Sequence, residues 1–418
     1  MKKQSLLNLL NSLVTPAFGC TEIGCIAYAS STAAEYLSND LKEMLVYVSP
    51  FIYRNVANVG VPELGKVGVD GIAAAGYVVK KPEKKLMVLN GITKSQIQQT
   101  HKLLKNELVK FFILKKCDPV YTKVIAKDIK GNICEVLIEQ KHDTIQHIKL
   151  NDCKIFVEKP AVIKDADETI NVKDVSLTDI YNGIQMLNRK DLHFFIRGIN
   201  MNEDIAKVGD QKHYFKLKNK KTNWREHILF HVCNAISARM DGCPLPVMSS
   251  NDSGDHGITV NLPQYVYHLQ KHTQPIVMLR AIALANLITW KIKKNIGSLS
   301  AYCGSVVAAA TGTIVGIGYQ RNYTLKQIND LINYCLCSYS GSLCDGAKLS
   351  CSWKVESALI IGFKVLKLVE SKQCLPNGEG TVNKDAFQTI KLLGMLSQKI
   401  MNITNSKVID IINFNRTN

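Results

Sequence analysis

The chain has 418 residues, of which 46% are hydrophobic, and its 52 basic and 35 acidic side chains give a net charge of +17. This apolar content excludes an intrinsically disordered chain, and the length exceeds what one hydrophobic core usually supports, so we expect two domains. A nucleic-acid or anionic-membrane partner would use the excess charge, but the lysines are scattered, and we interpret them as a compositional bias without such a partner.

The N-terminus and the cysteines indicate a cytoplasmic protein with reduced thiols. Thirteen cysteines would suit a secreted disulfide protein, but such a protein carries a signal peptide. The N-terminal apolar run is instead interrupted by Asn8, Asn11 and Pro16, which favours an amphipathic helix. Residues 297–320 carry no charge and are long enough to span a bilayer, but their small and β-branched side chains favour a buried helix pair.

Helices rich in small residues are predicted for much of the first 79 residues. Residues 6–14 have helical apolar spacing, and residues 23–37 continue as a helix after a turn that presents Cys20. Cys20 would lie where the positive end of a helix dipole lowers the pKa of a thiol. A buried, inert cysteine explains the same residues equally well.

From about residue 80 the pattern changes to that of a small α+β domain. Residues 120–126, 133–139 and 145–150 alternate as β-strands do, and Lys130-Gly-Asn132 predicts a hairpin turn between the first two. Helices are expected around these strands at residues 96–108, 177–187 and 192–208.

The remainder of the chain returns to a helical pattern. The predicted helices cover residues 226–239, 276–296, 359–370 and 386–401. Both flanks of the middle block share the same small-residue composition, which favours one domain built from two segments. The expected fold class is therefore α+β, with a mainly helical domain of residues 1–79 and 210–418 and an inserted, smaller α+β domain of residues 80–209.

Three cysteines of the C-terminal third, Cys303, Cys344 and Cys351, lie among glycines and other small residues. Thiolates on separate segments, with room for backbone N–H groups, suit a buried iron–sulfur cluster, and three of them leave one iron open. A structural zinc site prefers four ligands in short cysteine pairs, and Cys335-x-Cys337 has no matching pair. The residues alone leave two interpretations open, a cluster and unlinked buried cysteines.

Four motifs in order along the chain resemble the L-cysteine desulfidase family, which is related to the α chain of iron–sulfur L-serine dehydratases. They are Pro16-Ala-Phe-Gly-Cys-Thr-Glu22, Ala238-Arg-Met-Asp-Gly-Cys-Pro-Leu-Pro-Val-Met-Ser249, Ser298-Leu-Ser-Ala-Tyr-Cys-Gly304 and Leu343-Cys-Asp-Gly-Ala-Lys348. The resemblance implies an enzyme with a [4Fe-4S] cluster and without pyridoxal phosphate. It implies β-elimination of the small-molecule substrate L-cysteine to pyruvate, ammonia and sulfide, and it leaves a homo-oligomeric state open.

The same motifs imply roles for individual residues. Cys303, Cys344 and Cys351 are the expected cluster ligands, and Cys20 is the expected catalytic base or substrate-facing thiolate, with a role as a further ligand left open. A base at Cys20 needs a depressed thiol pKa. The candidates for binding the substrate carboxylate are Arg239, Ser249, Ser250, Asn251, Ser253 and Gly254.

Two loops near the expected site depart from the family pattern, at residues 63–66 and 252–257. In the second loop Asp252 and Asp255 would repel a substrate carboxylate unless a cation or His256 compensates. Two alternatives therefore stay open beside the desulfidase. One is an L-serine dehydratase that uses the same elimination, and the other is a non-catalytic iron–sulfur sensor or inactive relative.

Overall fold

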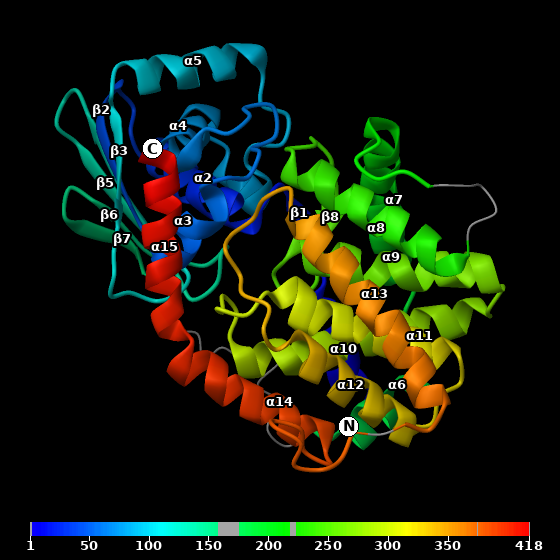
Figure 1. Cartoon of the computed structure of the whole chain (residues 1–418). Helices are drawn as coiled ribbons and strands as arrows, with labels where there is room; N and C mark the ends of the chain where they lie inside the picture. Colours follow the sequence, from blue (N-terminus) through cyan, green and yellow to red (C-terminus); the bar gives the residue numbers. More distant parts are fainter. Residues whose placement is uncertain (1, 158–174, 218–222, 374, 418) are drawn as a thin grey trace.

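The computed structural model describes residues 2–157, 175–217, 223–373 and 375–417, and these form a sheet lobe and a helical lobe (Figure 1). The sheet lobe covers residues 21–157. Its six-stranded sheet has the order β3-β2-β4-β5-β6-β7, with β2 and β3 parallel and all other neighbours antiparallel. The strands are β2 (Leu41–Val48), β3 (Val109–Ile113), β4 (Tyr121–Asp128), β5 (Ile133–Glu139), β6 (Ile145–Leu150) and β7 (Cys153–Val157).

The central strands are amphipathic, which explains where the helices of this lobe lie. Along β4 and β5 every second side chain is buried, so one face of the sheet needs a cover. The helices α2 (Thr21–Glu35) and α4 (Gly68–Val79) pack together, and α2 supplies the cover over β4 and β5. The shorter elements of the lobe are α3 (Pro50–Val56), the 3₁₀ helix η1 (Pro82–Met87) and α5 (Lys94–Lys105).

The strand β2 joins the two segments that the sequence analysis assigned to different domains. It lies before residue 80, yet it pairs with β3 and β4, which lie after it. The predicted division at residue 79 therefore passes through one hydrogen-bonded sheet. The strands predicted within the middle block are confirmed as β4, β5 and β6.

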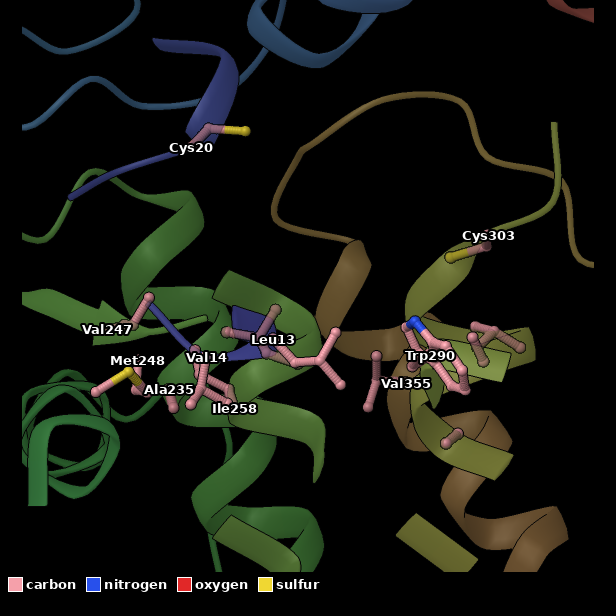
Figure 2. Close-up of a cluster of buried hydrophobic side chains, with 14 of the residues drawn as sticks. Leu13, Val14, Cys20, Ala235, Val247, Met248, Ile258, Trp290, Cys303 and Val355 are labelled. Carbon is pink, nitrogen blue, oxygen red and sulfur yellow. The ribbon is translucent and has the colours of Figure 1, made fainter. Parts of the chain in front are cut away.

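The helical lobe contains α1 and the helices from α6 to α14 (Figure 1). One continuous set of buried apolar side chains runs from this lobe into the sheet lobe, and Figure 2 shows a part of it around Ile258 and Trp290. The helices are α1 (Lys3–Leu13), α6 (Leu177–Gln185), α7 (Phe194–Lys212), α8 (Trp224–Met240), α9 (Gly254–Lys271), α10 (Pro275–Ile296), the π-helix η2 (Ser305–Ala310), α11 (Thr311–Gln320), α12 (Leu325–Tyr339), α13 (Cys351–Glu370) and α14 (Ala386–Met395).

The last helix returns to the sheet lobe. After the π-helix η3 (Leu396–Ile400), α15 (Asn402–Thr417) packs on α3, and Tyr53 of α3 donates its hydroxyl to Asn413 Oδ1 at 2.6 Å. Among the described residues, α10 is the one helix that is long and apolar enough to cross a membrane, and most of it is buried in the helical lobe. The predicted α+β fold class is confirmed, since most elements are helical and one mixed sheet accompanies them.

Candidate active site

A two-stranded sheet brings together two distant turns of the chain. β1 (Pro16–Phe18) pairs antiparallel with β8 (Pro246–Met248), and Thr21, just after β1, donates its hydroxyl to the backbone oxygen of Asp252, just after β8, at 3.2 Å. Cys20 is the N-cap of α2, and it follows Gly19, whose φ of +68° suits a glycine. After β8, Asn251 and Asp252 also have positive φ, which costs free energy and is common at functional sites.

Arg239, near the end of α8, holds both turns. Its Nη2 donates to the backbone oxygen of Gly19 at 2.9 Å, and its Nη1 donates to Asp255 Oδ1, in the first turn of α9, at 2.7 Å. A Cβ on Gly254 would lie 2.5 Å from Arg239 Nε, so only a glycine lets the guanidinium come so close. The Arg239 guanidinium is therefore already hydrogen-bonded to Gly19 and Asp255. A substrate carboxylate would have to bind Arg239 in the presence of these two partners.

Two cysteine segments form a second paired structure opposite the turns. Tyr302 and Leu343 make an isolated antiparallel bridge, and the backbone N–H groups of Cys303 and Cys344 donate across it to Ser342 and Ala301. This pairing places Cys303 and Cys344 next to each other although 41 positions separate them. The third cysteine, Cys351, begins α13, seven positions after Cys344.

Arg54 of α3 fastens these segments to the sheet lobe. The buried guanidinium donates to the backbone oxygens of Cys344 and Ser300 at 3.1 and 3.3 Å. Gly346, with φ +97°, lets the second segment approach closely, since a Cβ there would lie 2.2 Å from the backbone oxygen of Arg54. The cysteine segments thus depend on both lobes for their position.

Cys20, Cys303, Cys344 and Cys351 line one cavity between the lobes, with about 800 Å³ of empty space including its opening to solvent. In Figure 2 the sulfur atoms of Cys20 and Cys303 point from opposite sides toward the same space, above a layer of apolar side chains. The structure therefore brings together all four cysteines that the sequence analysis selected.

The six predicted carboxylate-binding residues divide into two groups. Arg239, Asn251 and Ser253 line the cavity. Ser249 donates its hydroxyl to the backbone oxygen of Thr15 at 2.7 Å, and Ser250 donates to Asn286 Oδ1 at 2.6 Å. Ser249, Ser250 and Gly254 are not among the lining residues and hold the turn together instead. Residues 254–257 of the expected polar loop form the first turn of α9.

The thiols of Cys303, Cys344 and Cys351 are the type of ligand that an iron–sulfur cluster takes. Within the described ranges no three Cys, His, Asp or Glu side chains lie close enough together to hold one metal ion. In an iron–sulfur cluster each cysteine binds a different iron atom. Burial raises the pKa of the Cys303 thiol to about 11 and also raises that of Cys351. Both would become thiolates beside a strong positive charge, which bound iron supplies.

Cys20 lies in a different electrostatic setting from the one expected. Burial raises the pKa of its thiol well above the usual range, and the neighbouring Glu22 carboxylate raises it further. The thiol donates to Glu22 Oε2 at 2.6 Å, while Asn55 donates to Glu22 Oε1 at 2.6 Å. Burial and Glu22 thus outweigh Arg239 and raise the pKa of Cys20, whereas a base at this position needs a depressed pKa, which the turn and a bound cluster would have to supply.

The acidic residues of the turn have cations beside them. Burial raises the pKa of Asp255, and the paired Arg239 opposes that rise. Lys293 of α10 lines the same cavity, interacts electrostatically with Asp252, and donates to the backbone oxygen of Ser298 at 2.5 Å. The repulsion expected from Asp252 and Asp255 is therefore offset by Lys293 and Arg239.

Several residues of this cavity were not predicted from the sequence, among them Arg54, Asn55, His142 and Lys293. No motif marks them, and Lys293 is one of 52 basic residues. Burial lowers the pKa of Lys293 to about 8, a perturbation that only the fold reveals. Glu22 was visible as the last residue of the first motif, but its contact with Cys20 was not.

Comparison with known proteins shows similarity over nearly the whole chain. The family profile described as serine dehydratase alpha chain matches residues 83–410. A UPF0597 protein of Clostridioides difficile is 31% identical over 97% of this chain and 99% of its own length. UPF0597 proteins of Clostridium tetani, at 32% identity, and Clostridium perfringens, at 31%, are also covered almost completely.

Proposed function

This chain belongs to the serine dehydratase alpha chain family, and we propose that it is an iron–sulfur lyase that breaks L-cysteine into pyruvate, ammonia and sulfide. The observation that carries the proposal is the convergence of Cys20 with Cys303, Cys344 and Cys351 in one cavity. Cys303, Cys344 and Cys351 would hold the cluster, and the sulfur of Cys20, the N-cap of α2, points toward the same space as that of Cys303 (Figure 2).

The chemistry divides between the cluster and the side chains of this chain. When bound by Cys303, Cys344 and Cys351, a [4Fe-4S] cluster supplies an open iron that acts as a Lewis acid on the leaving sulfur. Cys20, as a thiolate, takes the proton from Cα of the substrate. The electron pair of the Cα–H bond becomes the Cα=Cβ double bond while the Cβ–S bond breaks and sulfide departs with its pair. The aminoacrylate then hydrolyses to pyruvate and ammonia.

Lys293 is the residue that we propose to bind the substrate carboxylate. Arg239 is already paired with Asp255, whereas the Lys293 ammonium has one hydrogen bond to a neutral backbone oxygen and faces the cavity. Lys293→Met should raise the KM for L-cysteine by about tenfold to a hundredfold, since a hydrogen bond to a charged group contributes about 1.5–3 kcal/mol. Lys291→Met is the matched control, because Lys291 is as buried on the same helix but donates to Val175 outside the cavity. An unchanged KM in Lys293→Met would rule out this role.

The proposed function is tested by purifying the protein without oxygen, counting iron and sulfide, and measuring pyruvate from L-cysteine and L-serine on the same sample. We expect about four irons per chain and release of pyruvate and sulfide from L-cysteine. Iron without pyruvate from either amino acid would favour the sensor or inactive relative. Absence of iron after reconstitution would contradict the cluster.

L-Serine is the second candidate substrate, and the name of the matching family supports it. Both amino acids present the same carboxylate and ammonium groups, so the cavity residues described above serve either one. The leaving atom differs, and a soft sulfur binds iron more readily than a hydroxyl oxygen does. A larger kcat/KM for L-serine in the same assay would replace the desulfidase with a dehydratase.

A further inference from the structure

The active-site cavity adjoins a second chamber. The two spaces share Thr21, His142, Asn251, Asp252, Lys293 and Ser298 in their linings. The second chamber continues past His142 to Lys141 and Lys294, which are at the protein surface. His142 therefore stands where the buried site meets a space that is open to water.

His142 enters the site from the sheet lobe. It lies in the connection between β5 and β6, and its side chain is only 6% exposed. Its Nε2 has no hydrogen-bond partner among the described residues and lies 3.8 Å from Glu22 Oε1. A buried imidazole nitrogen without a partner is costly, and one so close to a carboxylate can exchange a proton with it after a small turn of the ring or through one water.

Glu22 connects His142 to the thiol of Cys20. One carboxylate oxygen accepts the Cys20 thiol at 2.6 Å, and the other faces His142 and accepts from Asn55. Burial alone would raise the pKa of Glu22, but His142 and the hydrogen bonds lower it on balance, so the carboxylate is ionised. The charged groups that line the two chambers around this pair include Arg54 of α3, Asp143, Arg239 of α8, Asp252, Asp255 of α9 and Lys293 of α10.

We propose that Glu22 and His142 form a proton relay that serves Cys20, with His142 passing the proton to water in the second chamber. This inference rests on the proposed elimination and adds the route of the substrate's α-proton. No motif indicated His142, and Glu22 was visible only as the last residue of the first motif.

The relay balances over one turnover. Transfer of the thiol proton from Cys20 to Glu22 gives a thiolate and a carboxylic acid, so the number of negative charges in the buried site does not change. Because no new buried charge forms, this proton transfer requires less free energy than ionisation of the thiol alone. After the thiolate has taken the α-proton, Cys20 is a thiol again and Glu22 still carries its proton. That proton moves to Nε2 of His142, whose Nδ1 proton leaves to water, while the departing hydrosulfide takes a proton from solvent.

The test replaces His142 by alanine in the cluster-loaded enzyme and adds free imidazole. Loss of a group that transfers protons should lower kcat on the order of a hundredfold, and imidazole entering the second chamber should restore part of the rate in a dose-dependent way. The control is His147→Ala, which removes a histidine of the same hairpin that pairs with Glu135 at 2.8 Å and lines neither chamber. We expect His147→Ala to have the kcat of the wild type, and we expect added imidazole not to change it.

The other possible outcomes would contradict either the relay or the proposed function. An unchanged rate in His142→Ala, or a loss that imidazole does not restore while iron content and thermal stability stay normal, would overturn the relay. If His142→Ala does not fold, His142→Gln serves, and an unchanged kcat in that variant would overturn the relay. A wild-type enzyme that releases no pyruvate would instead refute the proposed function.

The rate at which Cys20 is alkylated is a second measurement, and it does not depend on turnover. In Glu22→Gln the charge that disfavours the Cys20 thiolate is gone, so iodoacetamide should alkylate Cys20 faster at a fixed pH, as followed by mass spectrometry. Pyruvate release by the same variant should fall, because the acceptor of the thiol proton is gone. A parallel fall of alkylation and turnover would show that Glu22 only holds the thiol in place, and would overturn its part in the relay.

Discussion

Cys303→Ala should abolish both iron retention and pyruvate release. Cys303 is one of three thiols on the cluster side of the cavity, and with two remaining thiols the cluster would lack a protein ligand at one more iron. The fold should survive, because the backbone N–H of Cys303, not its sulfur, makes the bridge to Ser342. The measurement is iron per chain and visible absorption after anaerobic reconstitution, followed by the pyruvate assay.

The matched control for this variant is Cys335→Ala. Cys335 is also buried, but it lies within α12 and does not line the cavity. Its loss should cost about 1 kcal/mol of folding free energy, as removal of one small buried group does, and should leave iron and pyruvate unchanged. Full iron content in Cys303→Ala would contradict its assignment as a ligand, and iron loss in both variants would point to instability.

The parts of the fold that sequence patterns predicted are those whose pattern is local. β4 and β5 alternate strictly between buried and half-exposed side chains, and that period of two is visible in the sequence. β2 was missed, although its pattern is similar, because it stands between helices with many small residues. Its pairing with β3 and β4 is a contact between distant segments, which a local pattern does not contain.

The difference between local patterns and contacts of distant segments also explains which residues of the candidate site were predicted. The cysteines were found because thiols among glycines are chemically conspicuous, and Cys303 and Cys344 meet through one antiparallel bridge. His142 and Lys293 were missed because their role depends on where β5–β6 and α10 bring them. The raised pKa of Cys20 in this structure was not predicted either, for a related reason. The helix dipole could be inferred from the turn, whereas burial and the contact with Glu22 appear only in three dimensions.

Cys20→Ser should retain the cluster and lose nearly all pyruvate release. Serine keeps the size and the hydrogen-bond donor to Glu22, so the first turn of α2 should stay intact. A hydroxyl has a far higher pKa than a thiol and does not provide the base, so kcat should fall by about 10²–10⁴-fold. Iron per chain and pyruvate from L-cysteine, measured on one anaerobic sample, test both parts of this expectation.

Cys25→Ser provides the comparison on the same helix. Cys25 is fully buried, and its sulfur donates to Thr122 of β4, so it faces the sheet and not the cavity. Serine can make the same hydrogen bond, and both iron and kcat should stay near the wild-type values. Normal turnover in Cys20→Ser would remove Cys20 from the reaction and leave Glu22 as the nearest candidate base, since its ionised carboxylate borders the same cavity. Loss of iron from Cys20→Ser, with Cys25→Ser intact, would instead make Cys20 a fourth cluster ligand and exclude it as the base.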